Sequence, residues 1–179
     1  MRVELGSPPE ANPAPARQHG QGRAGGLTGV NDAVITTRAL QRELESRGYL
    51  IGANDGVAGL VTRAAIMAYE YDHGIALTGE PTERLLQAVI LGTATSDAPA
   101  SANQPVGPYA EQVIRTTQQS LSGLGYGPIK ADGFMGDTTV GAIRRFEHQQ
   151  GLPETGRISG VLVARLAKFA ALGQVQSGR

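Results

Sequence analysis

The stretch DGFMGDTTVGAIRRFE, residues 132–147, reads as a tight turn followed by a helix, and the chain carries a related stretch, DGVAGLVTRAAIMAYE, at residues 55–70. Each begins with Asp-Gly, a pair typical of turns because the Asp oxygens accept backbone N–H groups and Gly adopts a positive φ. The apolar residues that follow recur at helical spacing. They are Ala65, Ile66 and Tyr69 in the first stretch and Ala142, Ile143 and Phe146 in the second.

The similarity extends beyond these two stretches in both directions. Residues 38–91 align with residues 115–168 without a gap, and 16 of the 54 aligned pairs are identical. The identical pairs include glycines at the ends of expected helices, such as Gly48 with Gly125. Matches of this kind, at positions that begin and end secondary structure, indicate a duplicated domain.

Each copy predicts three helices. Asp32 is a suitable N-cap for the first helix of the first copy, and Pro108 suits the first turn of its counterpart. Gly48 and Gly125 supply the left-handed residue that ends these helices. No segment alternates like a strand for long enough to compete. The expected helices span residues 33–47, 60–72 and a third beginning after Thr82 in the first copy, and residues 109–124, 137–149 and a third beginning after Ser159 in the second.

The predicted fold class is all-α: two small three-helix bundle modules in tandem, joined by a flexible linker and preceded by a disordered tail. The tail and the linker are inferred from composition, since both are rich in Gly, Pro, Ala and polar residues and poor in residues that could form a core. The predicted boundaries are 1–30 for the N-terminal tail, 31–91 for module 1, 92–108 for the linker, 109–172 for module 2 and 173–179 for the C-terminal tail.

The composition argues against several classes of partner and site. The formal net charge is zero, with 16 basic and 16 acidic residues, so no general attraction to nucleic acid or to an anionic membrane is expected. Without cysteine the chain has neither disulfides nor thiolate metal sites. No apolar run is long enough to predict a membrane helix, and the N-terminus lacks the apolar core of a secretory signal. We therefore expect no nucleic-acid partner and no direct membrane insertion by this chain.

The sequence also argues against catalysis. A zinc peptidase site needs clustered histidines with a carboxylate, whereas His19, His73 and His148 do not recur at equivalent positions of the two copies. A carboxylate pair for glycoside cleavage needs a cleft deeper than a module of this size can form, and Glu70 and Asp72 are interpreted as solvated helix surface. We predict no catalytic residues, no metal and no cofactor.

Both copies carry the same ordered series of motifs. In the first copy the series runs Leu40-Gln41-x-x-Leu44-x-x-x-Gly48-Tyr49, then Asp55-Gly56-x-x-Gly59-x-x-Thr62-x-x-Ala65-Ile66-x-x-Tyr69, then Gly74-Ile75-x-x-Thr78-Gly79. This series resembles the bacterial peptidoglycan-binding domain of the three-helix type. The resemblance implies non-catalytic modules that hold a wall hydrolase or an envelope protein against peptidoglycan. The family usually has Gln where this chain has Glu70 and Glu147.

The Asp-Gly loops and the tyrosines after the first helices are the candidate peptidoglycan-binding residues. The loops would offer hydrogen bonds to amide and hydroxyl groups, and the tyrosines would stack on a sugar or an acyl group. Structural roles remain open for the same residues, because Asp-Gly pairs form turns and a tyrosine at this place can pack its loop onto the core. The candidates are Tyr49, Asp55, Gly56 and Thr62 in module 1, and Tyr126, Asp132, Gly133 and Thr139 in module 2.

The expected function is weak binding of peptidoglycan, through its glycan strand or stem peptide, by two modules whose tethering raises avidity. Binding would anchor or target the chain at the envelope, so the expected location is the periplasm or cell envelope. Two alternatives remain open. One is a protein–protein interaction module that docks an envelope partner through the apolar and basic surface of module 2. The other is the targeting part of a cell-wall hydrolase whose catalytic domain is not in this chain.

Overall fold

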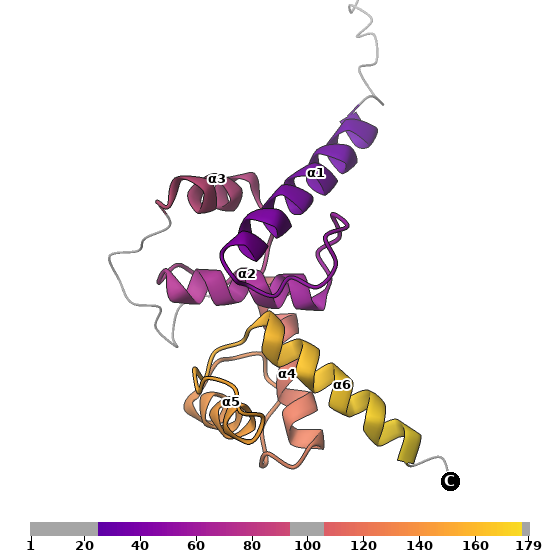
Figure 1. The fold of residues 1–179 in the computed structure, drawn as a ribbon, viewed down its shortest axis with the longest axis vertical. Helices are drawn as coiled ribbons and strands as arrows, with labels where there is room; N and C mark the ends of the chain where they lie inside the picture. Colours follow the sequence, from indigo (N-terminus) through magenta and orange to yellow (C-terminus); the bar gives the residue numbers. More distant parts are fainter. Residues whose placement is uncertain (1–24, 94–105, 177–179) are drawn as a thin grey trace, which may run out of the picture.

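A computed structural model describes residues 25–93 and 106–176 of the chain, and the regular secondary structure of these residues consists of six α-helices (Figure 1). No helix in these two ranges combines the length and the apolar character that crossing a bilayer requires. The helices are α1 (Gly25–Ser46), α2 (Leu60–Asp72), α3 (Glu83–Leu91), α4 (Pro108–Gly123), α5 (Asp137–Gln149) and α6 (Gly160–Gln176).

Helices α2 and α5 have the predicted bounds, and the all-α prediction is confirmed. The Thr82 hydroxyl accepts a hydrogen bond from the Leu85 N–H, so Thr82 caps α3 as expected. The prediction for Asp32 was wrong. Helix α1 begins at Gly25, inside the stretch predicted as tail, and residues 25–31 contain no proline to stop the helix.

The remaining predicted boundaries fall partly outside the described residues. The structure does not describe residues 1–24 of the predicted tail or residues 94–105 of the predicted linker. Helix α6 continues to Gln176, past the predicted end of module 2 at residue 172. Pro108 occupies the first turn of α4, and Gly48 and Gly125 have φ of 86° and 84°, so these residues begin and end the helices as predicted.

Helices α1, α2 and α3 enclose the core of module 1. Helix α1 packs on α3 and α2, and Tyr69 of α2 is 1 % exposed at the centre. The buried apolar residues of this core are Leu40, Leu44, Ile51, Ala65, Ile66, Tyr69, Leu85 and Val89.

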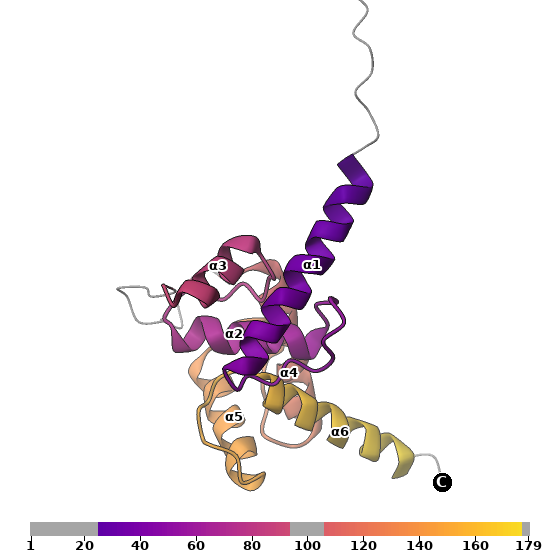
Figure 2. The same ribbon diagram turned by 45° about the horizontal axis from the view of Figure 1, so that its top comes forward.

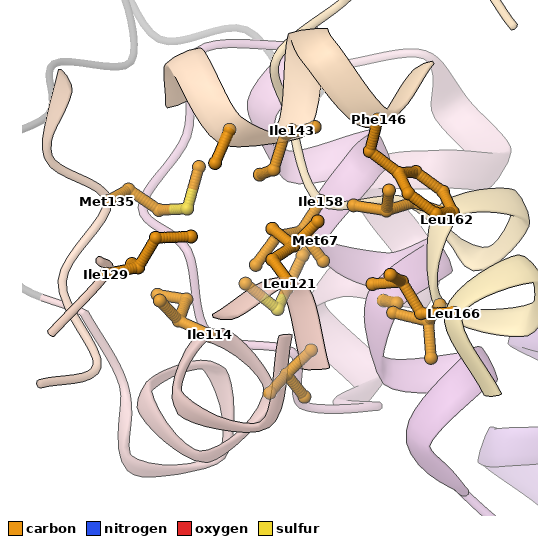
Figure 3. Close-up of a cluster of buried hydrophobic side chains, with 14 of the residues drawn as sticks. Met67, Ile114, Leu121, Ile129, Met135, Ile143, Phe146, Ile158, Leu162 and Leu166 are labelled. Atoms are coloured by element: carbon orange, nitrogen blue, oxygen red, sulfur yellow. The ribbon is translucent and has the colours of Figure 1, made fainter. Parts of the chain in front are cut away.

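The core of module 2 includes residues from module 1. Helices α4, α5 and α6 supply most of it, but Ala64 and Met67 of α2 belong to the same buried cluster. Figure 3 shows Met67 among Ile114, Leu121 and Leu162 of module 2. Both ribbon views place α2 between α1 and α3 on one side and the helices of module 2 on the other (Figures 1 and 2). We expected two separate bodies, whereas the structure joins the modules through a shared apolar core.

A difference between the two copies explains why α2, and not α5, lies in the interface. Helix α2 is buried over the whole run from Ala64 to Glu70. The positions of α5 equivalent to Ala64, Met67 and Ala68 hold Gly141, Arg144 and Arg145, and the two arginines are exposed. Burying a methionine side chain contributes about 1.5–3 kcal/mol, whereas burying an unpaired arginine is costly. Only the outer face of α2 is therefore suited to packing against another module.

Hydrogen bonds and an ion pair also join the modules. The backbone N–H groups of Gly107 and Ala110 donate to the carbonyl oxygens of Leu77 (2.8 Å) and Thr78 (3.1 Å). Module 1 thus satisfies N–H groups at the start of α4 that have no partner inside the helix. Arg157 Nε lies 3.1 Å from an Asp72 carboxylate oxygen. These contacts fix the orientation of one module on the other.

Candidate functional site

The Asp-Gly loop of module 1 is built around the buried amide of Gln41. Gln41 Nε2 donates to the carbonyl oxygens of Ala53 (2.9 Å) and Val57 (3.1 Å) and to Thr62 Oγ1 (3.2 Å). Gln41 Oε1 accepts the Gly56 N–H at 2.9 Å. The Thr62 hydroxyl donates in turn to a backbone carbonyl oxygen. The polar atoms of Gly56 and Thr62 are therefore used inside the loop.

The Asp-Gly loop of module 2 repeats this arrangement around Gln118. Gln118 Nε2 donates to Asp132 Oδ1 (3.0 Å), to the Phe134 carbonyl oxygen (2.9 Å) and to Thr139 Oγ1 (3.0 Å). Gln118 Oε1 accepts the Gly133 N–H at 2.9 Å. The structure thus brings Asp132, Gly133 and Thr139 together, but their polar groups bind Gln118.

The aspartates of the two loops accept backbone hydrogen bonds as turn residues do. Asp55 Oδ1 accepts the Val57 N–H at 2.8 Å, and Asp132 Oδ1 accepts the Phe134 N–H at 3.0 Å. These backbone bonds are the main reason why the pKa of each carboxyl lies below its usual range. This geometry agrees with the structural role of the Asp-Gly pair, in which the Asp side chain accepts a backbone N–H group of the turn.

The tyrosines after the first helices lie near the other end of the second helices. The Tyr49 hydroxyl donates to Asp72 Oδ2 (2.9 Å), and its ring packs edge-on against Tyr69. Burial raises the pKa of the Tyr49 phenol, and the Asp72 carboxylate adds to this rise. Tyr126 makes the matching contacts with Gln149 and Phe146. The tyrosines are separate from the Asp-Gly loops, and each holds its own loop on the core.

Two buried glutamates, absent from the predicted site, hold a turn in each module. Glu70 is 1 % exposed and Glu147 is 3 % exposed, so the interpretation of Glu70 as solvated surface was wrong. Glu70 Oε2 accepts the N–H groups of Thr78 (2.8 Å) and Gly79 (3.0 Å), and the Thr78 hydroxyl binds Oε1. Glu147 binds the corresponding Thr-Gly pair. Each carboxylate satisfies backbone groups that would otherwise be buried without partners.

Burial gives Glu70 an unusual titration. It raises the pKa of the carboxyl from 4.5 to about 7, against the opposing effect of the hydrogen bonds from Thr78 and Gly79. The folded state therefore binds the proton more tightly than the unfolded chain does. The stabilisation is complete below about pH 4.5 and is lost as the pH rises toward 7.

We predict that Glu70→Gln removes this pH dependence. The wild type should lose at most about 1.4 kcal/mol of unfolding free energy per pH unit between about pH 4.5 and 7. Glutamine can accept both backbone N–H groups through its carbonyl oxygen and donate to the Thr78 hydroxyl without ionising. Urea unfolding at about pH 5 and about pH 8 measures the difference, with the exposed Glu45→Gln as control. If the unfolding free energy changed equally with pH in the wild type and in Glu70→Gln, the prediction would be contradicted.

An open groove lies beside the Glu70 turn in module 1, between the loop after α2 and helix α3. Its volume is about 620 Å³. Apolar side chains form part of the lining, while Thr82, Arg84 and Gln87 add polar groups from the start of α3. We call this cavity the module 1 groove. Its lining residues are Glu70, Ile75, Ala76, Thr78, Thr82, Arg84, Leu85, Gln87, Ala88, Leu91 and Thr93.

Module 2 has an equivalent groove that is narrowed by module 1. Glu147, Leu152, Pro153, Thr155 and Ser159 line it at the positions of Glu70, Ile75, Ala76, Thr78 and Thr82. The segment 48–50 of module 1 forms its other wall, and the remaining volume is about 220 Å³. Both modules thus build the same groove, and its volume is larger in module 1.

The contact between segment 48–50 and module 2 depends on a glycine. A Cβ placed on Gly160 would lie 1.8 Å from the carbonyl oxygen of Leu50. The equivalent residue of module 1 is Glu83, which is exposed at the start of α3. The backbone of module 1 can therefore approach α6 closely, whereas a side chain stands at the corresponding point of α3.

The histidines of the described residues serve local contacts. His73 stacks on Tyr69 with ring centroids 3.9 Å apart, and His148 Nδ1 lies 2.7 Å from a Glu154 carboxylate oxygen. Within residues 25–93 and 106–176, no three side chains from His, Cys, Asp and Glu gather as a metal site requires.

Comparison with known proteins identifies the family of the two modules. No curated protein and no solved structure matches the chain significantly. One family model matches twice, over residues 36–89 and 110–166, and its description is "Putative peptidoglycan binding domain". The two matched regions lie within the two helical modules and together cover more than half of the chain. The chain therefore belongs to the peptidoglycan-binding domain family and contains two tandem copies of that domain.

Proposed function

We propose that the chain binds peptidoglycan without catalysis and that the module 1 groove is the binding site. The observation that supports this proposal is the repeated groove. Both modules build it from equivalent residues, but segment 48–50 narrows it in module 2 and leaves about 620 Å³ open in module 1. Anchoring or targeting at the cell envelope follows as the role of such binding.

The groove is a better candidate than the Asp-Gly loops. The amides of Gln41 and Gln118 bind the polar atoms of those loops, which leaves few of them for a ligand. The groove instead presents Arg84 and Gln87 on an exposed helix surface beside apolar side chains. Binding sites commonly combine an apolar lining with a few oriented polar groups. Tyr49 contributes to the proposal indirectly, as part of the segment that narrows the second groove.

The shared core changes the expected number of sites. Tethering two equal sites by a linker would raise avidity, but here the module 2 groove is reduced to about 220 Å³ and the two modules share a core. We therefore propose one peptidoglycan site per chain. Module 2 would orient module 1 and protect the outer face of α2 from water.

We predict that Ala76→Trp weakens retention on purified sacculi about tenfold. Ala76 is exposed and lines the module 1 groove, so an indole ring there fills the groove without entering the core. A tenfold loss corresponds to about 1.4 kcal/mol. Cosedimentation of the full chain with sacculi, before and after muramidase digestion, measures retention.

The same substitution on the exposed face of α1, Ala33→Trp, is the matched control and should bind as the wild type does. Equal retention of both variants would exclude the groove as the site. Failure of the wild type to sediment with sacculi would remove peptidoglycan binding itself and favour the alternative, a protein–protein interaction module of this fold that docks an envelope partner.

A further inference from the structure

We infer that the module 1 groove takes a stem peptide of peptidoglycan, with a peptide carboxylate held by Arg84, and not the glycan strand. The inference rests on the proposed function, since it names the part of peptidoglycan that the same groove contacts. Two observations support it: the peptide segment that forms a wall of the equivalent groove in module 2, and an arginine of the module 1 groove that has no ion-pair partner among the described residues.

The first observation is that a peptide segment already forms one wall of the equivalent groove. Residues 48–50 of module 1 line the groove of module 2 together with Leu152 and Ser159. The close approach to α6 is made by main chain, because the Leu50 carbonyl oxygen lies where a Cβ on Gly160 would stand. The Tyr49 hydroxyl is held by its bond to Asp72. The lining of this groove therefore packs against polypeptide main chain.

The second observation is a difference in pairing between the arginines that line the two grooves. Arg157 lines the module 2 groove and forms an ion pair with Asp72 of module 1. Arg84 lines the module 1 groove at the position of Val161 in module 2. It is exposed and takes part in none of the ion pairs found among the described residues. Since a guanidinium binds a carboxylate through two parallel hydrogen bonds, Arg84 can hold a carboxylate that comes from a ligand.

The rest of the lining also fits a peptide better than a sugar. Among the residues that the structure describes, no aromatic side chain lines the module 1 groove, so these residues offer no flat ring on which a sugar could stack. Ala76 and Ala88 leave room for small side chains such as the alanines of stem peptides. Thr82 and Gln87 can bond peptide groups. The carboxylate of Glu70 is already bonded by Thr78 and Gly79, so it is engaged within the turn.

Competition with the two products of one digestion tests the inference. An amidase separates sacculi into free stem peptides and peptide-free glycan strands. Each product is added to the full-length chain bound to intact sacculi, and the protein released into the supernatant is measured. We expect the stem peptides to displace the chain and the glycan strands to leave it bound. We also expect stem peptides with amidated carboxyl groups to displace it about tenfold less well.

Each outcome has a distinct meaning. Displacement by the glycan strands, alone or as effectively as by the peptides, would overturn the inference and leave peptidoglycan binding intact. A wild type that does not bind intact sacculi would overturn the proposed function as well. Displacement by both kinds of peptide alike would overturn the role of the carboxylate.

Variants at Arg84 test the cation directly. Arg84→Gln should weaken retention on intact sacculi about tenfold, and Arg84→Lys should restore part of it because the charge is kept. Arg84 is exposed, so neither change disturbs the core. Arg42→Gln, an exposed change on α1, is the matched control. An Arg84→Gln chain that sacculi retain as they retain the wild type would overturn the assignment of Arg84.

Discussion

Replacing Gln41 with alanine is expected to lower the free energy of unfolding by about 3–5 kcal/mol. Gln41 is fully buried, and its amide makes four hydrogen bonds to the Asp-Gly loop and to Thr62. Alanine leaves the buried Gly56 N–H without its partner, removes the bonds to the Ala53 and Val57 carbonyl oxygens, and opens a cavity. Each unsatisfied buried group costs about 1–3 kcal/mol. Urea unfolding followed by circular dichroism measures the loss.

Two further variants separate the causes of this loss. Gln41→Leu keeps most of the side-chain volume and removes only the hydrogen bonds, so it should retain most of the destabilisation. Gln119→Ala changes an exposed glutamine and should stay within about 0.5 kcal/mol of the wild type. A Gln41→Leu chain as stable as the wild type would show that packing, and not the amide, holds the loop.

The helices could be predicted from sequence because local residues mark their ends. Gly59 and Gly136 precede the second helices, and positive-φ Gly74 and Gly151 follow them, so α2 and α5 have the predicted bounds. The upstream start of α1 could not be predicted in this way. No residue between Gly25 and Asp32 stops a helix, and a suitable N-cap residue such as Asp32 is tolerated inside one.

The candidate site was harder to predict because distant residues decide it. The sequence predicted Asp55 in a turn and Thr62 in the helix that follows it, but not that Gln41 on another helix bonds both the turn and Thr62. Glu70 carried a usable signal. A glutamate eight residues before a Thr-Gly pair recurs in both copies, and the structure shows it bonded to that pair. A polar residue that recurs in both copies next to core residues of the same helix therefore indicates a buried side chain.

The shared core also left a signal in the sequence. An amphipathic surface helix carries polar residues on one face, as α5 does with Arg144 and Arg145. Helix α2 has Met67 and Ala68 at those positions and is therefore apolar on a second face. Comparing the copies position by position thus points to an interface. It does not reveal what covers that face, since the partner surface comes from α4 and α6.

Gly160→Ala is expected to cost at least about 2 kcal/mol of unfolding free energy and to loosen the contact between the modules. The backbone φ of Gly160 is not in the left-handed region, so the cause is steric. An added Cβ would lie 1.8 Å from the Leu50 carbonyl oxygen and 2.9 Å from its carbon, and neither backbone atom can turn away as a flexible side chain would. The segment 48–50 must then move off α6, which widens the groove of module 2.

The methyl resonance of Met67 reports this movement, because Met67 lies in the interface core. It should shift in Gly160→Ala, and urea unfolding should show the lost stability. Gly123→Ala is the matched control: no atom lies within 4 Å of the added Cβ, and alanine favours the helix. If Gly160→Ala kept both the Met67 resonance and the wild-type stability, the modules would not be held by this contact. The narrowing of the second groove would then be incidental, and two open sites per chain would again be the better account of peptidoglycan binding.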